Sequence, residues 1–448
     1  MSRPVVALVG RTNVGKSTLL NRLAGERLVV VDDQPHVTRD RVFAPVTWAG
    51  RDMLFVDTGG WAPVAESSLG LKVKHQAELA LERADVVVLV ASATDGVIAS
   101  DEEVVGLVRA AGKATILAVN KVDTDRRDPM LADFHRLGVE RVIAVSAIHD
   151  RGIDELMDAV VSLLPPAEPP APAATGVLRL AIVGRPNAGK STLLNAFLGD
   201  ERAIVDETPG TTRDSLDAEL AWKGRKLILV DTAGIRRRSQ LGYGVDYFSV
   251  LRSMQAIDRC DVAILVLDAI EPATAQDNSI ARYVFESGKG LVLVVNKWDL
   301  VPAAEREAHK DRLKLRLDFL SHVPLLHISA KNNRNTTEVL MRAVEVADAR
   351  MLHLAPEVVD TAIKEAVERY APPRLGTRTL SVARASQDAS RPWVFIIRVN
   401  DLRLVQKTYL RYLEHQLRNQ FGFDGVPIHF VVVKAGRPSS GKGGKKTR

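Results

Sequence analysis

The chain has 448 residues, too many for a single hydrophobic core, so we expect about two or three domains. Apolar residues make up 46% and charged residues 26%, as in an ordinary globular protein. Apolar runs such as 86–91 are far shorter than the roughly 20 residues of a membrane helix, which argues against a membrane-spanning protein. The single cysteine, Cys260, cannot form an intrachain disulfide. The first residues also lack the apolar region of a signal peptide, so we expect a cytoplasmic protein.

The net charge of +6 is concentrated at the C-terminus. Residues 434–448 hold six Lys and Arg residues and no acid, and the remainder of the chain balances at 55 basic and 55 acidic residues. Two interpretations of this basic tail stay open. Six cations on a Gly- and Ser-rich segment would release counterions from a polyanion such as RNA, and they would equally keep a solvated tail soluble.

The first part of the chain, residues 1–164, alternates strand and helix patterns. We expect strands at 4–9, 53–56, 86–91 and 114–119, and a helix that begins at 16–23. Such alternation predicts a mostly parallel sheet with helices on both faces. Residues 165–177 are rich in Pro and Ala and are expected to form an extended linker.

The pattern then repeats over residues 178–347, with expected strands at 180–183, 226–230, 262–267 and 291–295. Residues 348–434 differ, because strand patterns at 379–386, 393–399 and 428–433 mix with helix patterns at 356–370 and 405–421. The order α-β-β-α-β predicts a small α+β domain. The fold class is therefore two α/β domains followed by an α+β domain, with 435–448 as a flexible tail.

An eight-residue signature, GxxxxGKS, occurs at 10–17 and again at 184–191, an offset of 174 residues. Its glycines let successive backbone N–H groups approach phosphates, the lysine adds positive charge, and the serine hydroxyl is a Mg²⁺ ligand. Each copy follows an expected strand and precedes an expected helix, as a P-loop requires. The residues expected to line the two phosphate sites are Gly10, Arg11, Thr12, Asn13, Val14, Gly15, Lys16, Ser17 and Thr18, and Gly184, Arg185, Pro186, Asn187, Ala188, Gly189, Lys190, Ser191 and Thr192.

Two further motifs recur at the same offset, which makes an accidental match implausible. Thr38 and Thr212 lie in polar loops of switch type and are expected to ligate Mg²⁺ when a γ-phosphate is bound. Asp57 and Asp231 end strands, where an acid would reach the metal through water. The second of these motifs reads Asp57, Thr58, Gly59 and Gly60 in the first copy, and Asp231, Thr232, Ala233 and Gly234 in the second.

A third pair of motifs selects the base. An aspartate carboxylate offers two acceptors to the two adjacent donors of guanine, whereas adenine would leave it unpaired. Main-chain N–H groups of a later loop would support the base from the other side. The residues assigned to guanine binding are Asn120, Lys121, Asp123, Ser146 and Ala147, and Asn296, Lys297, Asp299, Ser329, Ala330 and Lys331. The sequence therefore predicts two GTP or GDP sites.

These motifs resemble the five conserved motifs of the Era-like GTPases of the TRAFAC class. Two such domains before an α-β-β-α-β domain resemble the Der (EngA) family, bacterial tandem GTPases of large-subunit ribosome assembly. The resemblance implies a GTP-hydrolysing monomer that acts on the 50S ribosomal subunit or its precursor and on rRNA. It also implies a KH-like third domain. Because that segment lacks a G-x-x-G loop between helices, we expect it to serve at least partly as a protein surface that packs on the G domains.

The catalytic glutamine of Ras-like enzymes is missing, since Trp61 and Ile235 stand at its position. The family resemblance implies that K⁺ replaces it near the phosphates, with the side-chain oxygen of Asn13 or Asn187 as a ligand. A role of these asparagines in shaping the loop is the alternative. The groups expected to act in hydrolysis are Lys16, Thr38, Lys190, Thr212, Asn13 and Asn187.

The first domain departs from the family pattern at Thr12, where the family has proline, and at His36, where it has glycine. A β-carbon at His36 narrows the conformations of the first switch loop. Residues 236–238, three consecutive arginines, read either as an RNA or phosphate contact or as a solvated loop. A binding platform with little turnover remains the rival function, whereas the GTPase of a tRNA-modifying system does not fit this chain, which shows neither of the features that it requires. The latter predicts one G domain and a cysteine-bearing C-terminus.

Overall fold

A computed structural model describes residues 3–24, 43–57, 81, 84–123, 131–166, 177–199, 217–232, 246–372, 374–375 and 378–434. These residues fall into two compact units. Both segments that carry P-loop signatures belong to the unit that ends at Ala347, and the residues from Asp348 onward belong to the other. Within the described ranges, every helix is too short or too polar to cross a membrane.

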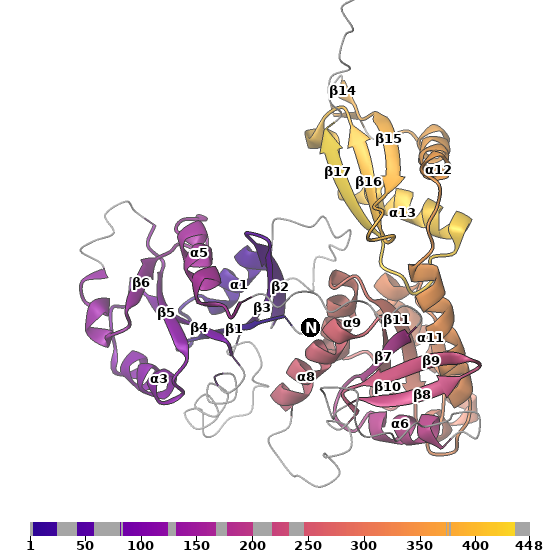
Figure 1. The fold of residues 1–448 in the computed structure, drawn as a ribbon, viewed down its shortest axis with the longest axis horizontal. Helices are drawn as coiled ribbons and strands as arrows, with labels where there is room; N and C mark the ends of the chain where they lie inside the picture. The colour runs from indigo at the N-terminus through magenta and orange to yellow at the C-terminus, as the bar shows by residue number, and fades with distance from the viewer. Residues whose placement is uncertain are drawn as a thin grey trace, which may run out of the picture. The chain divides into compact units, whose positions relative to one another are not determined.

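The first sheet has six strands in the order β2-β3-β1-β4-β5-β6, and all neighbours are parallel except β2 and β3. The strands are β1 (Val5–Val9), β2 (Phe43–Trp48), β3 (Arg51–Asp57), β4 (Val86–Ser92), β5 (Ala114–Asn120) and β6 (Arg141–Ala144). Helices α1 (Lys16–Ala24) and α5 (Ile153–Leu163) lie on one face and α3 (Ala99–Ala110) on the other (Figure 1). Strand β4 is buried along its whole length because both faces are covered, which explains its unbroken apolar run.

The second sheet repeats this plan in the order β12-β11-β10-β7-β9-β8, with only the β8–β9 pair antiparallel. Its strands are β7 (Val177–Val183), β8 (Ala218–Trp222), β9 (Arg225–Val230), β10 (Val262–Asp268), β11 (Gly290–Asn296) and β12 (Leu325–His327). Its helices are α6 (Lys190–Leu198), α8 (Asp246–Arg259), α9 (Ala275–Glu286), α10 (Arg306–Arg316) and α11 (Thr336–Arg350). The prediction of two mostly parallel α/β sheets is confirmed.

The edge strands β2 and β8 were not predicted. Each pairs antiparallel with its neighbour through a two-residue turn, since Trp48 faces Arg51 and Trp222 faces Arg225. The turn residues are Ala49 and Gly50, and Lys223 and Gly224, and all four have positive φ. Positive φ at both central positions is the type I′ turn that matches strand twist in hairpins. A residue followed by glycine, between two short strand-like segments, was therefore the sequence signal that could have predicted these hairpins.

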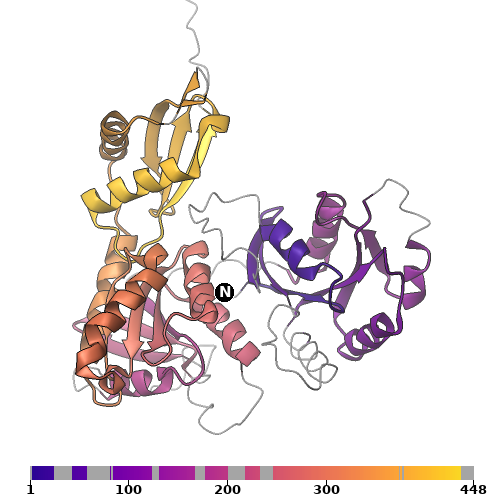
Figure 2. The ribbon, with the colours of Figure 1, turned by 180° about the vertical axis from the view of Figure 1, so that it is seen from behind.

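The C-terminal unit is a three-stranded sheet with two helices on one face (Figures 1 and 2). Its elements follow the predicted order: α12 (Pro356–Arg369), β15 (Val382–Gln387), β16 (Val394–Val399), α13 (Lys407–Phe421) and β17 (His429–Lys434). Strand β16 is antiparallel to β15 and parallel to β17, and a two-residue pair, β13 (Arg374–Leu375) and β14 (Arg378–Thr379), precedes them. Buried Ile363 of α12, Leu413 of α13 and Phe395 of β16 belong to its core.

One glycine limits the packing of the second sheet. A β-carbon on Gly290 would lie 2.6 Å from Val346 Cγ1, so Gly290→Ala should destabilise the second domain by about 1–3 kcal/mol through overpacking. Gly106→Ala is the matched control, because Gly106 lies in α3 with no heavy atom within 4 Å, and alanine favours helix. Thermal unfolding followed by circular dichroism should show a lowered transition for Gly290→Ala only. Equal transitions would contradict the packing argument.

Candidate nucleotide-binding sites

Each P-loop wraps around the ammonium group of its own lysine. Lys16 Nζ donates to the carbonyl oxygens of Gly10 and Arg11, both at 2.7 Å. Lys190 Nζ donates to Gly184 O at 2.8 Å and to Arg185 O at 2.5 Å. Each lysine is also the first residue of the helix that follows the loop, α1 or α6. The lysine is thus held at a helix N-terminus, where the orphan N–H groups and the helix dipole favour an anion.

Burial lowers the pKa of Lys16, and the nearby carboxylate of Asp57 partly offsets this effect. Asp57 is completely buried at the end of β3, and its Oδ2 accepts a hydrogen bond of 2.5 Å from Ser17 Oγ. A hydroxyl and a carboxylate that converge in this way are the hard oxygen donors that Mg²⁺ prefers, so these residues fit the ion. Ser191 and Asp231 hold the corresponding places at the start of α6 and after β9.

A buried asparagine joins three loops in each domain. Asn120 Nδ2 donates to Val14 O in the P-loop at 2.9 Å, and Asn120 Oδ1 accepts from Ala147 N at 3.1 Å. In the second domain Asn296 Nδ2 donates to Ala188 O at 2.9 Å and Oδ1 accepts from Ala330 N at 3.0 Å. Each of these asparagines is 3% exposed. The amide therefore connects the phosphate loop, its own loop and the Ser-Ala loop.

The aspartate expected to read guanine is exposed in both domains. Ser146 Oγ donates to Asp123 Oδ1 at 2.7 Å, which orients that carboxylate. The lysines of the same motifs, Lys121 and Lys297, have φ of 67° and 63°, a left-handed conformation that turns the chain after the strand. The structure therefore brings the predicted base loop, Ser-Ala loop and P-loop together at the carboxyl ends of the parallel strands.

Comparison with known proteins agrees with this arrangement. A family model described as "50S ribosome-binding GTPase" matches residues 5–121 and 179–297. A second, described as "KH-domain-like of EngA bacterial GTPase enzymes, C-terminal", matches residues 355–432. The curated GTPase Der of Moorella thermoacetica is 42% identical over 98% of this chain and 100% of its own length. That of Myxococcus xanthus is 42% identical over 98% of this chain and 97% of its own length.

The chain belongs to the GTPase Der family. It is therefore a GTP-binding protein with two P-loop G domains and a C-terminal KH-like domain. This family membership excludes the single-domain tRNA-modifying rival. Among solved structures, Era in complex with MgGDPNP and nucleotides 1506–1542 of 16S ribosomal RNA aligns at 21% identity and a TM-score of 0.29, over 58% of this chain and 93% of that one. A likeness this low supports no inference about this chain.

Several predicted site residues lie outside the described ranges. They are Thr38, Thr58, Gly59, Gly60, Thr212, Ala233 and Gly234. The same holds for His36, Trp61, Ile235, residues 236–238 and the basic tail from residue 435. The described part of each site is therefore the P-loop, the end of the strand that carries the acid, the base loop and the Ser-Ala loop.

An ion pair distinguishes this Der-family chain's second site from its first. Lys297 Nζ lies 2.6 Å from Asp268 Oδ2, at the end of β10. The sheet register pairs Asp268 with Asn296 and pairs Ser92 with Asn120, so Ser92 occupies the same place in the first domain. Ser92 Oγ instead shares a hydrogen bond with Thr94 Oγ1 at 2.9 Å. Asp268 was not predicted from the sequence, although its position at the end of the strand before the base motif was a usable signal.

Among the residues that the structure describes, the second base loop also makes aromatic contacts that have no counterpart at the first. Trp298 contacts the rings of His327 and His309, with centroids 4.2 and 5.2 Å apart, and His309 Nε2 lies 2.6 Å from Ala269 O. Burial lowers the pKa of His327 to about 4, so this ring packs as a neutral group at neutral pH. The first domain has buried Val122 at the position of Trp298.

We expect the Lys297–Asp268 ion pair to slow nucleotide release from the second site. A tethered lysine has less freedom to lose when nucleotide binds. Asp268→Ser should therefore speed GDP release by about fivefold, and Ser92→Asp should slow release from the first site by a similar factor, as for an ion pair worth about 1 kcal/mol. Each site is read by stopped-flow release of fluorescent GDP after the P-loop lysine of the other site is replaced by alanine.

Glu219→Gln is the control for this comparison, because it removes an ion pair with Lys226 on the β8–β9 hairpin. Its release rate should equal that of the parent protein. Unchanged rates in both Asp268→Ser and Ser92→Asp would show that the ion pair does not retain nucleotide.

Proposed function

We propose that the chain is a Mg²⁺-dependent, K⁺-stimulated GTPase that acts in assembly of the large ribosomal subunit. The observation that carries the guanine assignment is the pair of base loops, each tied to its P-loop by a buried asparagine. Membership of the GTPase Der family and the family model named for 50S ribosome binding support the assembly role. We further propose the domain boundaries given above, a monomeric state and a cytoplasmic location.

The roles of the protein groups follow from their chemistry. Lys16 and Lys190 place positive charge against the β- and γ-phosphates. Ser17 with Asp57, and Ser191 with Asp231, would hold Mg²⁺ together with Thr38 or Thr212, and a bound ion would supply positive charge against the transferred phosphoryl group. Asn13 and Asn187 have exposed side chains and φ of 65° and 61°, so their oxygens are accessible to a monovalent cation.

The guanine assignment predicts a change of base preference. In Asp299→Asn the carboxylate that accepts from guanine N1–H and the 2-amino group is lost. GTP affinity at the second site should fall by at least about a hundredfold. Xanthosine triphosphate, which has a carbonyl in place of the amino group, should bind the variant more tightly than it binds the parent protein. Equilibrium titration of each nucleotide measures this shift in a protein with Lys16→Ala. Asp311→Asn on exposed α10 is the control and should behave as the parent does.

The cation role predicts faster GTP turnover in KCl than in NaCl at equal ionic strength. Asn187→Gly separates the two interpretations of the P-loop asparagine, because glycine accepts the positive φ but supplies no side-chain oxygen. With the first site silenced, this variant should keep GDP affinity and lose the response to K⁺. Equal turnover of the parent protein in both salts would remove the cation from the mechanism.

The assembly role predicts nucleotide-dependent association with ribosomal subunits. The protein is sedimented with 50S and 30S particles in the presence of GDP, GTP or a non-hydrolysable analogue. Binding to the 50S particle or its precursor should be strongest in one nucleotide state, because GTP and GDP favour different arrangements of the domains. Equal binding in every state would favour the rival function, a binding platform with little turnover.

A further inference from the structure

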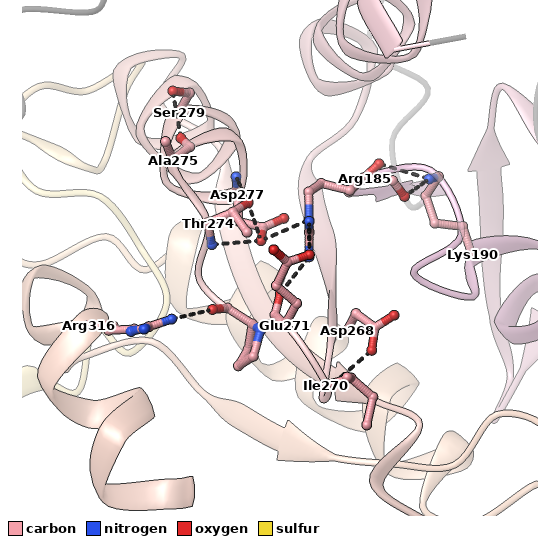
Figure 3. Close-up of polar contacts among 12 residues, drawn as sticks. Arg185, Lys190, Asp268, Ile270, Glu271, Thr274, Ala275, Asp277, Ser279 and Arg316 are labelled. Carbon is pink, nitrogen blue, oxygen red and sulfur yellow. Dashed lines mark hydrogen bonds and ion pairs between the residues drawn. The ribbon is translucent and has the colours of Figure 1, made fainter. Parts of the chain in front are cut away.

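An arginine follows the first glycine of each P-loop, and its side chain extends to the start of α3 in the first domain and of α9 in the second. In the second domain Arg185 reaches the segment between β10 and α9 (Figure 3). Arg185 Nη1 donates to Glu271 Oε2 at 3.0 Å, and Nη2 donates to the main-chain carbonyl of Glu271. Its Nε lies 3.3 Å from Asp277 Oδ2. One guanidinium therefore contacts two acids on one short segment.

The first domain has the same arrangement built from other residues. Arg11 Nη2 donates to Asp95 Oδ2 at 2.6 Å, and Nε lies 3.3 Å from Asp101 Oδ1. In both domains one acid is buried and the other exposed: the side chains of Asp101 and Asp277 are 4% and 1% exposed, against 41% for Asp95 and 73% for Glu271. The same geometry recurs in both domains, with an aspartate as the buried acid and either aspartate or glutamate as the exposed one, which indicates a shared requirement.

The buried acid is itself fixed. Asp277 lies in the first turn of α9 and its Oδ2 accepts from Thr274 N at 3.0 Å and from Thr274 Oγ1 at 2.9 Å. Asp101 Oδ2 accepts from Ile98 N at 3.1 Å in the first turn of α3. Each side chain therefore caps its helix and binds the arginine at once, so the arginine is anchored to a rigid helix end rather than to a free side chain.

The main chain of the same arginine holds the P-loop lysine. Lys16 Nζ donates to Arg11 O and Lys190 Nζ to Arg185 O, so each arginine links the lysine on one side to the helix cap on the other. We propose that Arg11 and Arg185 are positioning residues, which fix the P-loop carbonyls and thereby the lysine that faces the nucleotide phosphates. This inference rests on the proposed nucleotide-binding function of the two sites.

Because one acid is buried and the other exposed, substitutions of the arginine and of the two acids should differ in how strongly they affect nucleotide binding. An exposed ion pair contributes little, whereas removing one partner of a buried pair leaves an uncompensated charge. Loss of the guanidinium should thus matter most, loss of the Asp277 charge next, and loss of the Glu271 charge least. A role in surface solubility alone would give no such order.

The experiment uses the full chain with Lys16→Ala, so that only the second site is read. The variants are Arg185→Met, Arg185→Lys, Asp277→Asn and Glu271→Gln. The control is Arg312→Met, because Arg312 on exposed α10 bonds within its own helix. Four quantities are measured: release of fluorescent GDP, kcat and KM for GTP, the affinity ratio of GTP to ITP, and the thermal transition of the nucleotide-free protein.

Arg185→Met should release GDP about tenfold faster and lower kcat by a similar factor, since a misplaced phosphate-binding group costs affinity and rate together. The preference for GTP over ITP should not change, because the base loop keeps its contacts. The GDP release rate of Arg185→Lys should lie between those of Arg185→Met and the parent. Asp277→Asn should change the release rate more than Glu271→Gln does. Arg11→Met in a Lys190→Ala protein should repeat the result at the first site.

Unchanged GDP release and kcat in Arg185→Met would overturn the inference. So would a loss of GTP-over-ITP preference together with a lowered thermal transition, because that pair of changes marks general loosening of the domain. If the parent protein binds no guanine nucleotide at all, the proposed function itself fails, and the two failures are thereby distinguished.

Discussion

A buried side-chain amide holds each nucleotide site together. Asn120 and Asn296 are almost fully buried, and each satisfies its amide nitrogen on the P-loop and its amide oxygen on the Ser-Ala loop. A buried amide that lost either partner would leave an unpaired polar group, which is costly in a low-dielectric interior. The three loops therefore keep one relative position, and the phosphate and base halves of the pocket form a single structure.

The two domains share one fold but hold their base loops with different side-chain contacts. The second base loop has an ion pair between Lys297 and Asp268 and an aromatic contact of Trp298 with two histidines, while the first has Ser92 and Val122 at those places. The asparagine bridges are the same in both. The common contacts fix the geometry of the pocket, and the additional contacts differ in how firmly the base loop is held before nucleotide arrives.

The connection from β10 to α9 contacts both halves of the second site. Asp268 at its start binds the lysine of the base loop, and Glu271 and Asp277 farther along bind the arginine of the P-loop. Ile270 N donates to Asp268 Oδ1 at 2.9 Å, which stiffens the start of this segment. A change in this short connection would therefore alter contacts of both the base-loop lysine and the P-loop arginine.

The sequence by itself determined the motifs and most of the sheets. Lys16 and Lys190 stand at a fixed spacing from glycines whatever the rest of the fold does, and strands such as β4 and β10 are apolar throughout because both faces are buried. The edge strands β2 and β8 were not predicted, because β2 contains Pro45 and β8 is buried only at Leu220 and Trp222 and so lacks a continuous apolar run.

Only the tertiary structure decided which partners the motif residues have. The sequence marked Arg11 and Arg185 as part of the phosphate loop, but their acidic partners lie more than eighty residues away, and the exposed one is aspartate in the first domain and glutamate in the second. In the same way, the ion pair of Asp268 with Lys297 could be recognised only from the register of β10 and β11, which places the two residues side by side. Spacing along the chain fixes chemistry that is local, whereas contacts between strand ends depend on register and packing, which a single sequence does not reveal.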